Sequence, residues 1–429
     1  LMEITILVLA FVILIALRVP VAWSIGISGL LTILISVKTI PALTTVAQRV
    51  ITGLDSFSLL AIPFFILAGH IMNKGGIAKR LIEFAKALVG SLPGGLAHVN
   101  IVAAMLFGAI AGSAGAAAAA IGSFMSDQME DEGYDKNYGV AVNVTSATTG
   151  LLIPPSNIFI IYSLASGGVS IGALFLAGYI PGLLTGFLLM LVAYIWAKKK
   201  GYPTAERSNF KTIAKSFIGA VPSLFLLIVI IGGIVAGIFT ATEASSVAVL
   251  YCFILAFAYK EISVKDVKGI LVESSATIAI VMLLIAMSIA MSWVMSYEDI
   301  PQTVTEALLG LSDNKIMVLV LINLILLFVG IFMDMTPAVL IFTPIFLPVV
   351  MALGIDPVHF GIIMVLNLCI GLCTPPVGSV LFIGVSVGKT SIQKVIKPLL
   401  PLFAAMLVSL VLVSLFPELS LWLPHFFGF

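Results

Sequence analysis

Apolar runs of about 20 residues follow one another through this chain, and each is long enough to cross the ~30 Å hydrocarbon core of a bilayer. In hydrocarbon only helices and closed barrels satisfy every backbone hydrogen bond, and runs of this length indicate helices. The composition agrees, because 61% of the 429 residues are hydrophobic and only 10% are charged, against about 25% charged in an average soluble domain. The sequence therefore predicts an all-α polytopic membrane protein.

A proline pair interrupts an apolar run at the same relative place in each half of the chain. The segment GLLIPPSN, residues 150–157, returns in outline as GLCTPPVG, residues 371–378, an offset of 221 positions. Upstream, FGAIAGSAG (107–115) corresponds to FVGIFMDMT (328–336), and AKALVG (85–90) corresponds to TEALLG (305–310). A shared order of features along so much sequence indicates an internal repeat.

Each half is predicted to contain five crossings and one interrupted segment that forms a re-entrant hairpin. An odd number of crossings inverts the second repeat relative to the first. The first repeat, 1–200, has scaffold helices within 1–73, an arm helix at 75–90, a hairpin at 94–130, a broken helix at 138–166 and a helix at 171–196. A cytoplasmic linker, 201–216, leads to the second repeat, 217–429, with scaffold helices at 217–297, an arm at 300–311, a hairpin at 316–351, a broken helix at 359–386 and a helix at 398–416.

Basic residues orient this arrangement, since cytoplasmic loops carry the excess of lysine and arginine. If the basic run 198–200 is cytoplasmic, only Lys38, Arg49 and Lys315 of the 21 basic residues fall outside. Both termini are then expected on the outer face. The first arm, 75–90, has apolar positions at helical spacing beside basic residues, as expected of a helix that lies on the lipid surface.

The interruptions predict a cation site in each half. Proline removes a backbone donor and unwinds the preceding turn, which frees carbonyl groups around Gly150 to Ile153 and around Gly371 to Thr374. The first hairpin tip offers Gly112, Ser113 and Gly115, and the second offers Asp334 and Thr336. A carboxylate within a membrane segment usually marks an ion or proton pathway. The residues alone leave Na⁺ and H⁺ both open as the coupling ion.

Polar residues around the first break, with one counterpart in the second half, form the predicted substrate site. No lysine or arginine lies in the predicted membrane core, so an anion would be held by hydroxyls, amides, helix ends and a bound cation. The candidates are Asn143, Thr148, Thr149, Ser156, Asn157 and Ser379.

Five segments of the chain are distinctive as a set: GSAGAAAAAIG, GLLIPPSN, TATEAS, FMDMTPAVLIFTPIFLP and GLCTPPVG. With them, the chain resembles the large membrane subunit of tripartite ATP-independent periplasmic (TRAP) transporters over essentially its whole length. The resemblance implies an elevator-type importer in the bacterial inner membrane, coupled to Na⁺. It also implies a small four-helix membrane subunit, here expected as a separate chain, and a periplasmic binding protein that delivers an organic acid such as sialic acid or a C4-dicarboxylate. For Na⁺ it implies Ser113 and Gly150 at one site, and Asp334, Thr336, Gly371 and Thr374 at the other.

Other readings of the same residues remain open at this point. A carboxylate symporter that works without a binding protein would share every feature described so far. An intramembrane enzyme is a remote alternative, because GISG at 26–29 matches a short serine-protease pattern. No feature indicates a nucleic-acid partner.

Overall fold

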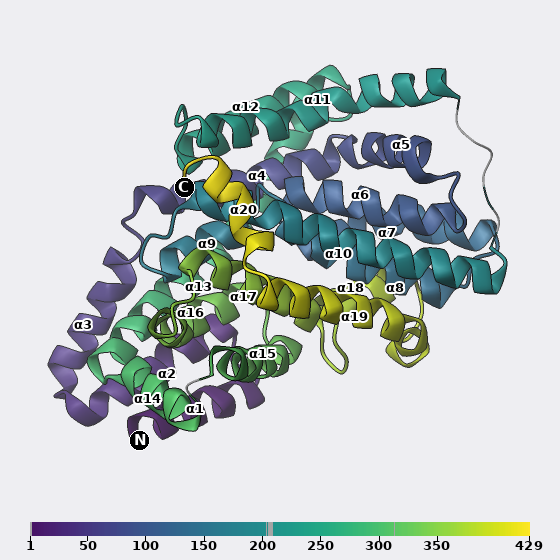
Figure 1. Ribbon diagram of the computed structural model, residues 1–429. Coiled ribbons are helices and arrows are strands. Elements are labelled where there is room, and N and C mark those ends of the chain that lie inside the picture. Colours follow the sequence, from purple (N-terminus) through teal and green to yellow (C-terminus); the bar gives the residue numbers. More distant parts are fainter. Residues whose placement is uncertain (1, 203, 205–208, 313) are drawn as a thin grey trace.

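The computed structural model describes residues 2–202, 204, 209–312 and 314–429, and all of its regular structure in these ranges is helical (Figure 1). Part of the predicted linker at 201–216 lies outside the described residues. By length and composition, eight of the described helices can cross a membrane, or nine if the bent pair at 136–165 counts as one span. The fold is therefore that of a multi-span helical membrane protein.

The first part of the chain forms a group of helices before the first hairpin. These are α1 (Met2–Ala16), α2 (Val21–Ser36), α3 (Thr39–Thr52), the short 3-10 helix η1 (Phe57–Leu60), α4 (Ala61–Lys74) and α5 (Ile77–Val89). Helix α3 lies within the predicted scaffold region 1–73. This helix is too polar for a crossing, but it buries Ala42 and Val46, one turn apart, against α13.

Their counterparts after the linker region are α11 (Phe210–Val235), α12 (Ala241–Ala258), α13 (Val264–Tyr297) and α14 (Ile300–Leu311). Helix α4 packs against both α12 and α13, and α2 packs against α13. An ion pair between Lys74 and Glu273, 2.8 Å apart, links α4 to α13. The two groups are thus joined across the halves of the chain.

Each half also contains a helix pair with a short break, followed by a second interruption. In the first half these are α6 (Gly95–Ala111) with α7 (Ala114–Asp131), then α8 (Lys136–Thr149), η2 (Gly150–Leu152) and α9 (Asn157–Ala165). In the second half they are α15 (Lys315–Phe332) with α16 (Met335–Ala352), then α17 (Pro357–Leu372) and α18 (Ser379–Val387). Long helices follow each set: α10 (Ile171–Lys200) in the first half, and α19 (Ile392–Leu415) with the terminal α20 (Glu418–Phe426) in the second.

The interruptions fall at the proline pairs, Pro154-Pro155 and Pro375-Pro376, and the axes of α8 and α9 differ by 53°. Proline cannot donate to a helical hydrogen bond. We refer to α8 with α9, and to α17 with α18, as the two broken helices, and to α6 with α7, and α15 with α16, as the two hairpins.

Glycine pairs bring each hairpin against its broken helix. A methyl group on Gly150 would lie 2.8 Å from Gly108 Cα, and one on Gly371 would lie 2.6 Å from Gly330 Cα. The two pairs correspond in the repeat: Gly371 follows Gly150 by 221 positions, and Gly330 follows Gly108 by one position more. Backbones can approach this closely only where side chains are absent, as at small-residue interfaces in membrane proteins.

The two broken helices contact each other at equivalent positions. Cys369 Sγ donates a hydrogen bond to the carbonyl oxygen of Thr148 at 3.2 Å, and these residues are 221 apart in sequence. The hydroxyl of Thr148 also lies 3.3 Å from Cys373 Sγ. Buried residues of both broken helices and both hairpins form one continuous core.

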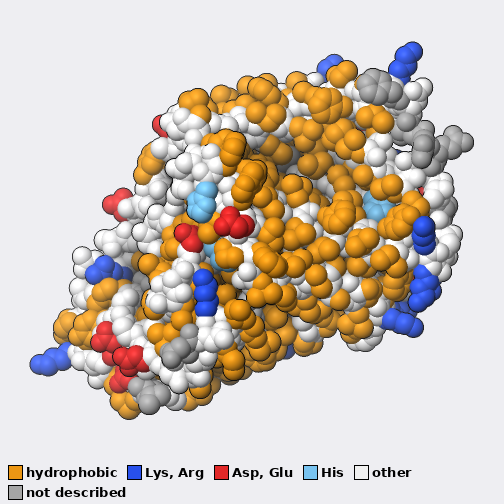
Figure 2. All heavy atoms as spheres, in the orientation of Figure 1, with side chains coloured by type: hydrophobic (Ala, Val, Ile, Leu, Met, Phe, Trp, Pro, Cys, Tyr) orange, Lys and Arg blue, Asp and Glu red, His pale blue; other side chains and the backbone are white. Residues whose placement is uncertain are grey.

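The surface of the molecule matches its composition. Figure 2 shows a broad apolar area across the middle of one face, with basic side chains gathered along the edge where α10 ends and acidic side chains toward the other end. Helix α10 ends in Lys198, Lys199 and Lys200. An apolar band between charged edges is the expected surface of a chain that crosses a bilayer.

Candidate transport site

A cavity of about 410 Å³ lies where the hairpin tips meet the broken helices. The first hairpin contributes Ala111 to Ala116 and the second contributes Asp334 to Thr336. Residues beside both breaks also line it, and α4 and α13 supply the remaining wall. The cavity therefore collects the interrupted segments of both halves in one place.

Four helices of the described chain begin at this cavity. The first residues of α7, α9, α16 and α18 all line it, and the residues before them are Ser113, Ser156, Asp334 and Gly378. The N-terminus of a helix carries a partial positive charge and free N–H groups, so it attracts anions. The convergence of four such ends gives the cavity a positive backbone potential, although no lysine or arginine is among the described residues that line it.

The first hairpin tip turns at Gly112, whose φ of 61° is in the left-handed region that favours glycine. Ser113 then caps α7, because its hydroxyl accepts a hydrogen bond from the backbone N–H of Ala116 at 3.2 Å. The side chain of Asn157, at the start of α9, packs on this turn, since a methyl group on Gly112 would lie 2.8 Å from Asn157 Nδ2. The tip is thus held against the second part of its broken helix.

The second tip has the same arrangement with different chemistry. Asp334 stands at the N-cap of α16, and the hydroxyl of Ser379, at the start of α18, donates a hydrogen bond to its carboxylate at 3.4 Å. Ser113 and Asp334 are equivalent positions in the repeat. One tip therefore offers only neutral oxygen atoms, whereas the other offers a carboxylate.

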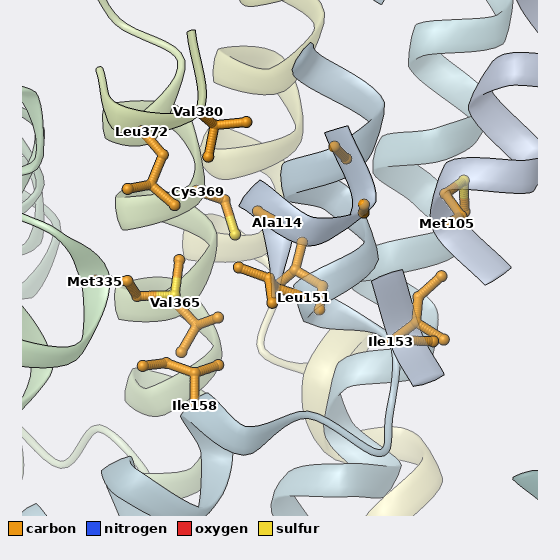
Figure 3. Packing of buried hydrophobic residues seen from close by; sticks show 14 of the residues in the cluster. Met105, Ala114, Leu151, Ile153, Ile158, Met335, Val365, Cys369, Leu372 and Val380 are labelled. Carbon is orange, nitrogen blue, oxygen red and sulfur yellow. The ribbon is translucent and has the colours of Figure 1, made fainter. Parts of the chain in front are cut away.

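Apolar side chains fill the space between these polar ends. Figure 3 shows Leu151, Ile158, Met335 and Leu372 from the two halves among the buried residues around this region, and all four line the cavity. The wall between the polar ends of the cavity is therefore largely apolar.

The structure brings only part of the predicted site to the cavity. Of the predicted residues, those that line it are Gly112, Ser113, Gly115, Asn157, Asp334, Thr336 and Ser379. Gly150 and Gly371 instead pack on their partner glycines, and Ile153 is buried near Gly182. The Thr374 hydroxyl donates to the carbonyl oxygen of Ile370 at 2.7 Å.

The remaining predicted substrate ligands have other surroundings. Asn143 Nδ2 donates to the carbonyl oxygen of Ala118 at 2.8 Å, which ties α8 to the first hairpin. Thr148 and Thr149 both donate to the carbonyl oxygen of Thr145, at 3.0 Å and 2.9 Å. Ser156 is 1% exposed and lies outside the cavity lining.

Three polar residues of the lining had no predicted role. His70 and Asn73 come from α4, and Thr277 comes from α13. The sequence offered one indication of this: a histidine and an asparagine lie one turn apart within an apolar run. Burying such polar side chains in a membrane segment is costly unless they face a cavity or a partner.

The serine of the GISG pattern is not arranged as a nucleophile. Ser28 is fully buried in α2, and its hydroxyl donates to the carbonyl oxygen of Ile25 at 3.0 Å. This is the ordinary back-bonding of a serine within a helix.

Comparisons with known proteins agree with this architecture. The family described as "Tripartite ATP-independent periplasmic transporter, DctM component" matches residues 8–419. An uncharacterized protein of Salmonella typhimurium, YgiK, is 56% identical over 98% of this chain and 96% of its own length. The large permease protein SiaM of a sialic acid TRAP transporter from Vibrio cholerae is 41% identical over 89% of each chain.

A solved structure shows a related fold. The YdaH transporter of Alcanivorax borkumensis, reported to have an unusual topology, superimposes with a TM-score of 0.66 over 87% of this chain and 88% of its own, at 13% identity. This likeness supports the fold alone. The family, by contrast, is a family of transporter permeases and not of enzymes. From the match along nearly all of its length, the chain belongs to the tripartite ATP-independent periplasmic transporters, as their large membrane component.

Proposed function

We propose that this chain is the transport subunit of a Na⁺-coupled importer that moves an organic acid across the bacterial inner membrane. The observation that carries the proposal is the cavity on which four helix N-termini and both hairpin tips converge. Its positive backbone potential suits a carboxylate. Its hydroxyl, carbonyl and carboxylate oxygens suit a small hard cation.

The coupling ion is proposed to bind at the two tips. At the second tip Asp334, with Ser379 and Thr336 beside it, supplies a negative charge that compensates a bound Na⁺. At the first tip Ser113 and nearby backbone carbonyls supply neutral ligands. A cation bound at either tip would in turn attract the substrate carboxylate, so that ion and acid stabilise each other in the cavity.

The movement is proposed to be of the elevator type. The hairpins and broken helices surround the cavity on one side, and α4 and α13, which are joined by the Lys74–Glu273 pair, form the opposing wall. The first group would move as one body against the second. With the orientation indicated by the basic residues, both termini face the periplasm.

The proposed partners follow from membership of a tripartite family: a small membrane subunit and a periplasmic binding protein that presents the acid. The Vibrio cholerae relative is named for sialic acid, and a sugar acid of this kind or a C4-dicarboxylate is the proposed substrate class.

Reconstitution tests the proposal. Proteoliposomes containing this chain and its small subunit are given a panel of radiolabelled organic acids, each with its binding protein, with and without an inward Na⁺ gradient. Uptake that requires both Na⁺ and the binding protein, and that is lost in Asp334→Ala, is the expected result. Uptake of free acid by this chain alone would instead indicate an ordinary carboxylate symporter, and H⁺-driven uptake would exclude Na⁺ coupling.

A further inference from the structure

One wall of the cavity differs chemically from the rest. His70, Asn73 and Thr277 line it but belong to α4 and α13, not to a hairpin or a broken helix. We call these three residues the α4–α13 wall. They place imidazole, amide and hydroxyl groups in a cavity whose other polar groups surround the helix N-termini.

The α4–α13 wall has hydrogen-bonding capacity that the protein itself does not use. Among the described residues, neither the His70 ring nor the Asn73 amide has a hydrogen-bond partner. The Thr277 hydroxyl donates only a long bond, 3.3 Å, to the carbonyl oxygen of Glu273, and its lone pairs remain free to accept. These donors and acceptors face the cavity and are available to water or to a ligand bound there.

The position of this wall is fixed from two sides. Lys74 directly follows Asn73, and Glu273 lies one turn before Thr277. Lys74 Nζ contacts Glu273 Oε1 at 2.8 Å, so α4 and α13 are linked beside the wall. On the other side, Gly69 seats α4 against the first hairpin, because a methyl group at Gly69 would lie 2.7 Å from the carbonyl oxygen of Ala111. In this conformation His70, the next residue, therefore lies beside the hairpin tip.

On the basis of the proposed function, we infer that the α4–α13 wall determines specificity by hydrogen bonding to the hydroxyl groups of the acid. The helix N-termini and the cation take the carboxylate, which leaves the remainder of the substrate for this wall. Neutral donors and acceptors match hydroxyl groups better than a second carboxylate. A site built to hydrogen-bond a hydroxyl strongly rejects the analogue that lacks it.

The test measures preference, not activity. The reconstituted complex takes up the radiolabelled acid that it transports, and unlabelled acids that differ only in hydroxyl groups compete: malate against succinate, and gluconate against hexanoate. The ratio of inhibition constants is determined for wild type, Thr277→Val, His70→Ala and His70→Gln. Because the same binding protein serves every variant, its own preference cancels in the comparison.

Loss of one hydrogen bond is expected to reduce the preference for the hydroxylated acid roughly fivefold in Thr277→Val and in His70→Ala. His70→Gln, which keeps a donor and an acceptor, retains part of the preference. The matched control is Thr44→Val on α3, where an exposed hydroxyl likewise donates to its own helix, at 2.9 Å to the carbonyl oxygen of Ile40. This control leaves the ratio unchanged.

The possible failures are separable. Sustained uptake with an unchanged ratio in both wall variants overturns the inference and leaves the proposed function intact, whereas a wild-type complex that imports no acid with Na⁺ overturns both. If both wall variants lose all uptake, Asn73→Cys decides, since the three native cysteines are buried. Protection of the new cysteine from maleimide by malate or gluconate, but not by succinate or hexanoate, supports the inference, and equal labelling refutes it.

Discussion

The contact between Gly371 and Gly330 gives the sharpest prediction, because it joins helix packing to the proposed cation site at the second tip. In Gly371→Ala the added methyl group would lie 2.6 Å from Gly330 Cα and 2.9 Å from the Gly330 carbonyl oxygen. Carbon atoms pack at about 3.5–4.0 Å, so α15 and α17 must separate by about 1 Å. Both contacts are backbone atoms, which cannot rotate away as a flexible side chain would.

The expected cost follows from two opposing effects. Overpacking a tight interface destabilises by about 1–3 kcal/mol, whereas alanine in place of glycine within a helix recovers up to about 1 kcal/mol. We expect Gly371→Ala to lose about 1–2 kcal/mol of stability on balance. Helix α17 leads into the break before Ser379. We therefore expect the same separation to lengthen the 3.4 Å contact between Ser379 and Asp334 and to weaken Na⁺ binding at the proposed site.

Two measurements on each purified variant check this prediction. Thermal unfolding in one detergent gives the change in apparent Tm, and a Na⁺ titration of uptake in proteoliposomes gives the concentration for half-maximal rate. The control is Gly219→Ala in α11, where an added methyl group meets nothing within 4 Å, and which we expect to be neutral or slightly stabilising. If Gly371→Ala matches wild type in both Tm and Na⁺ dependence, the close approach of the helices is not what positions the second tip.

Further predictions concern the ion site and the core. Asp334→Asn keeps the shape of the second tip but removes its charge, so we expect uptake to need a much higher Na⁺ concentration, which the same titration measures; unchanged Na⁺ dependence would place the coupling ion elsewhere. Asn367 is fully buried and donates to both the carbonyl oxygen and Oδ1 of Asn323, at 2.9 Å and 2.8 Å. Asn367→Leu should cost about 1–3 kcal/mol because it leaves Asn323 Oδ1 without its donor; an apparent Tm equal to wild type would contradict this. Maleimide should label the native protein only after denaturation, as mass spectrometry can show, because every cysteine is buried: Cys252, Cys369 and Cys373.

Some of this architecture could be predicted because certain residues act through the backbone alone. Two adjacent prolines remove two helical donors in succession, so the interruptions at 150–157 and 371–378 could be predicted where the structure has them. The hairpin tips were found in the same way, through Gly112 and through the N-cap residue Asp334.

The sideways packing of the helices could not be predicted, and neither could the complete lining of the cavity. In a membrane the faces of a helix toward lipid and toward protein are equally apolar, so hydrophobic periodicity does not show that α4 and α13 border the site. Asn143 and Thr148 were plausible ligands by type. In the structure Asn143 donates to Ala118 on the first hairpin, whereas Thr148 donates to Thr145 within its own helix. Both hydrogen bonds depend on contacts that the sequence does not display.

The contact between Thr148 and Cys369 also bears on how such a chain arose. If a gene for one half was duplicated and fused, the ancestor was a dimer of identical halves, and this residue touched its own copy across a two-fold axis. Any mutation of that residue changed both sides of the contact at once, so a donor on one side was always accompanied by the same donor on the other. Fusion ended that coupling, and the two positions now hold different residues. The same freedom applies to the tips, which were identical in such an ancestor and hold a serine and an aspartate in the present chain.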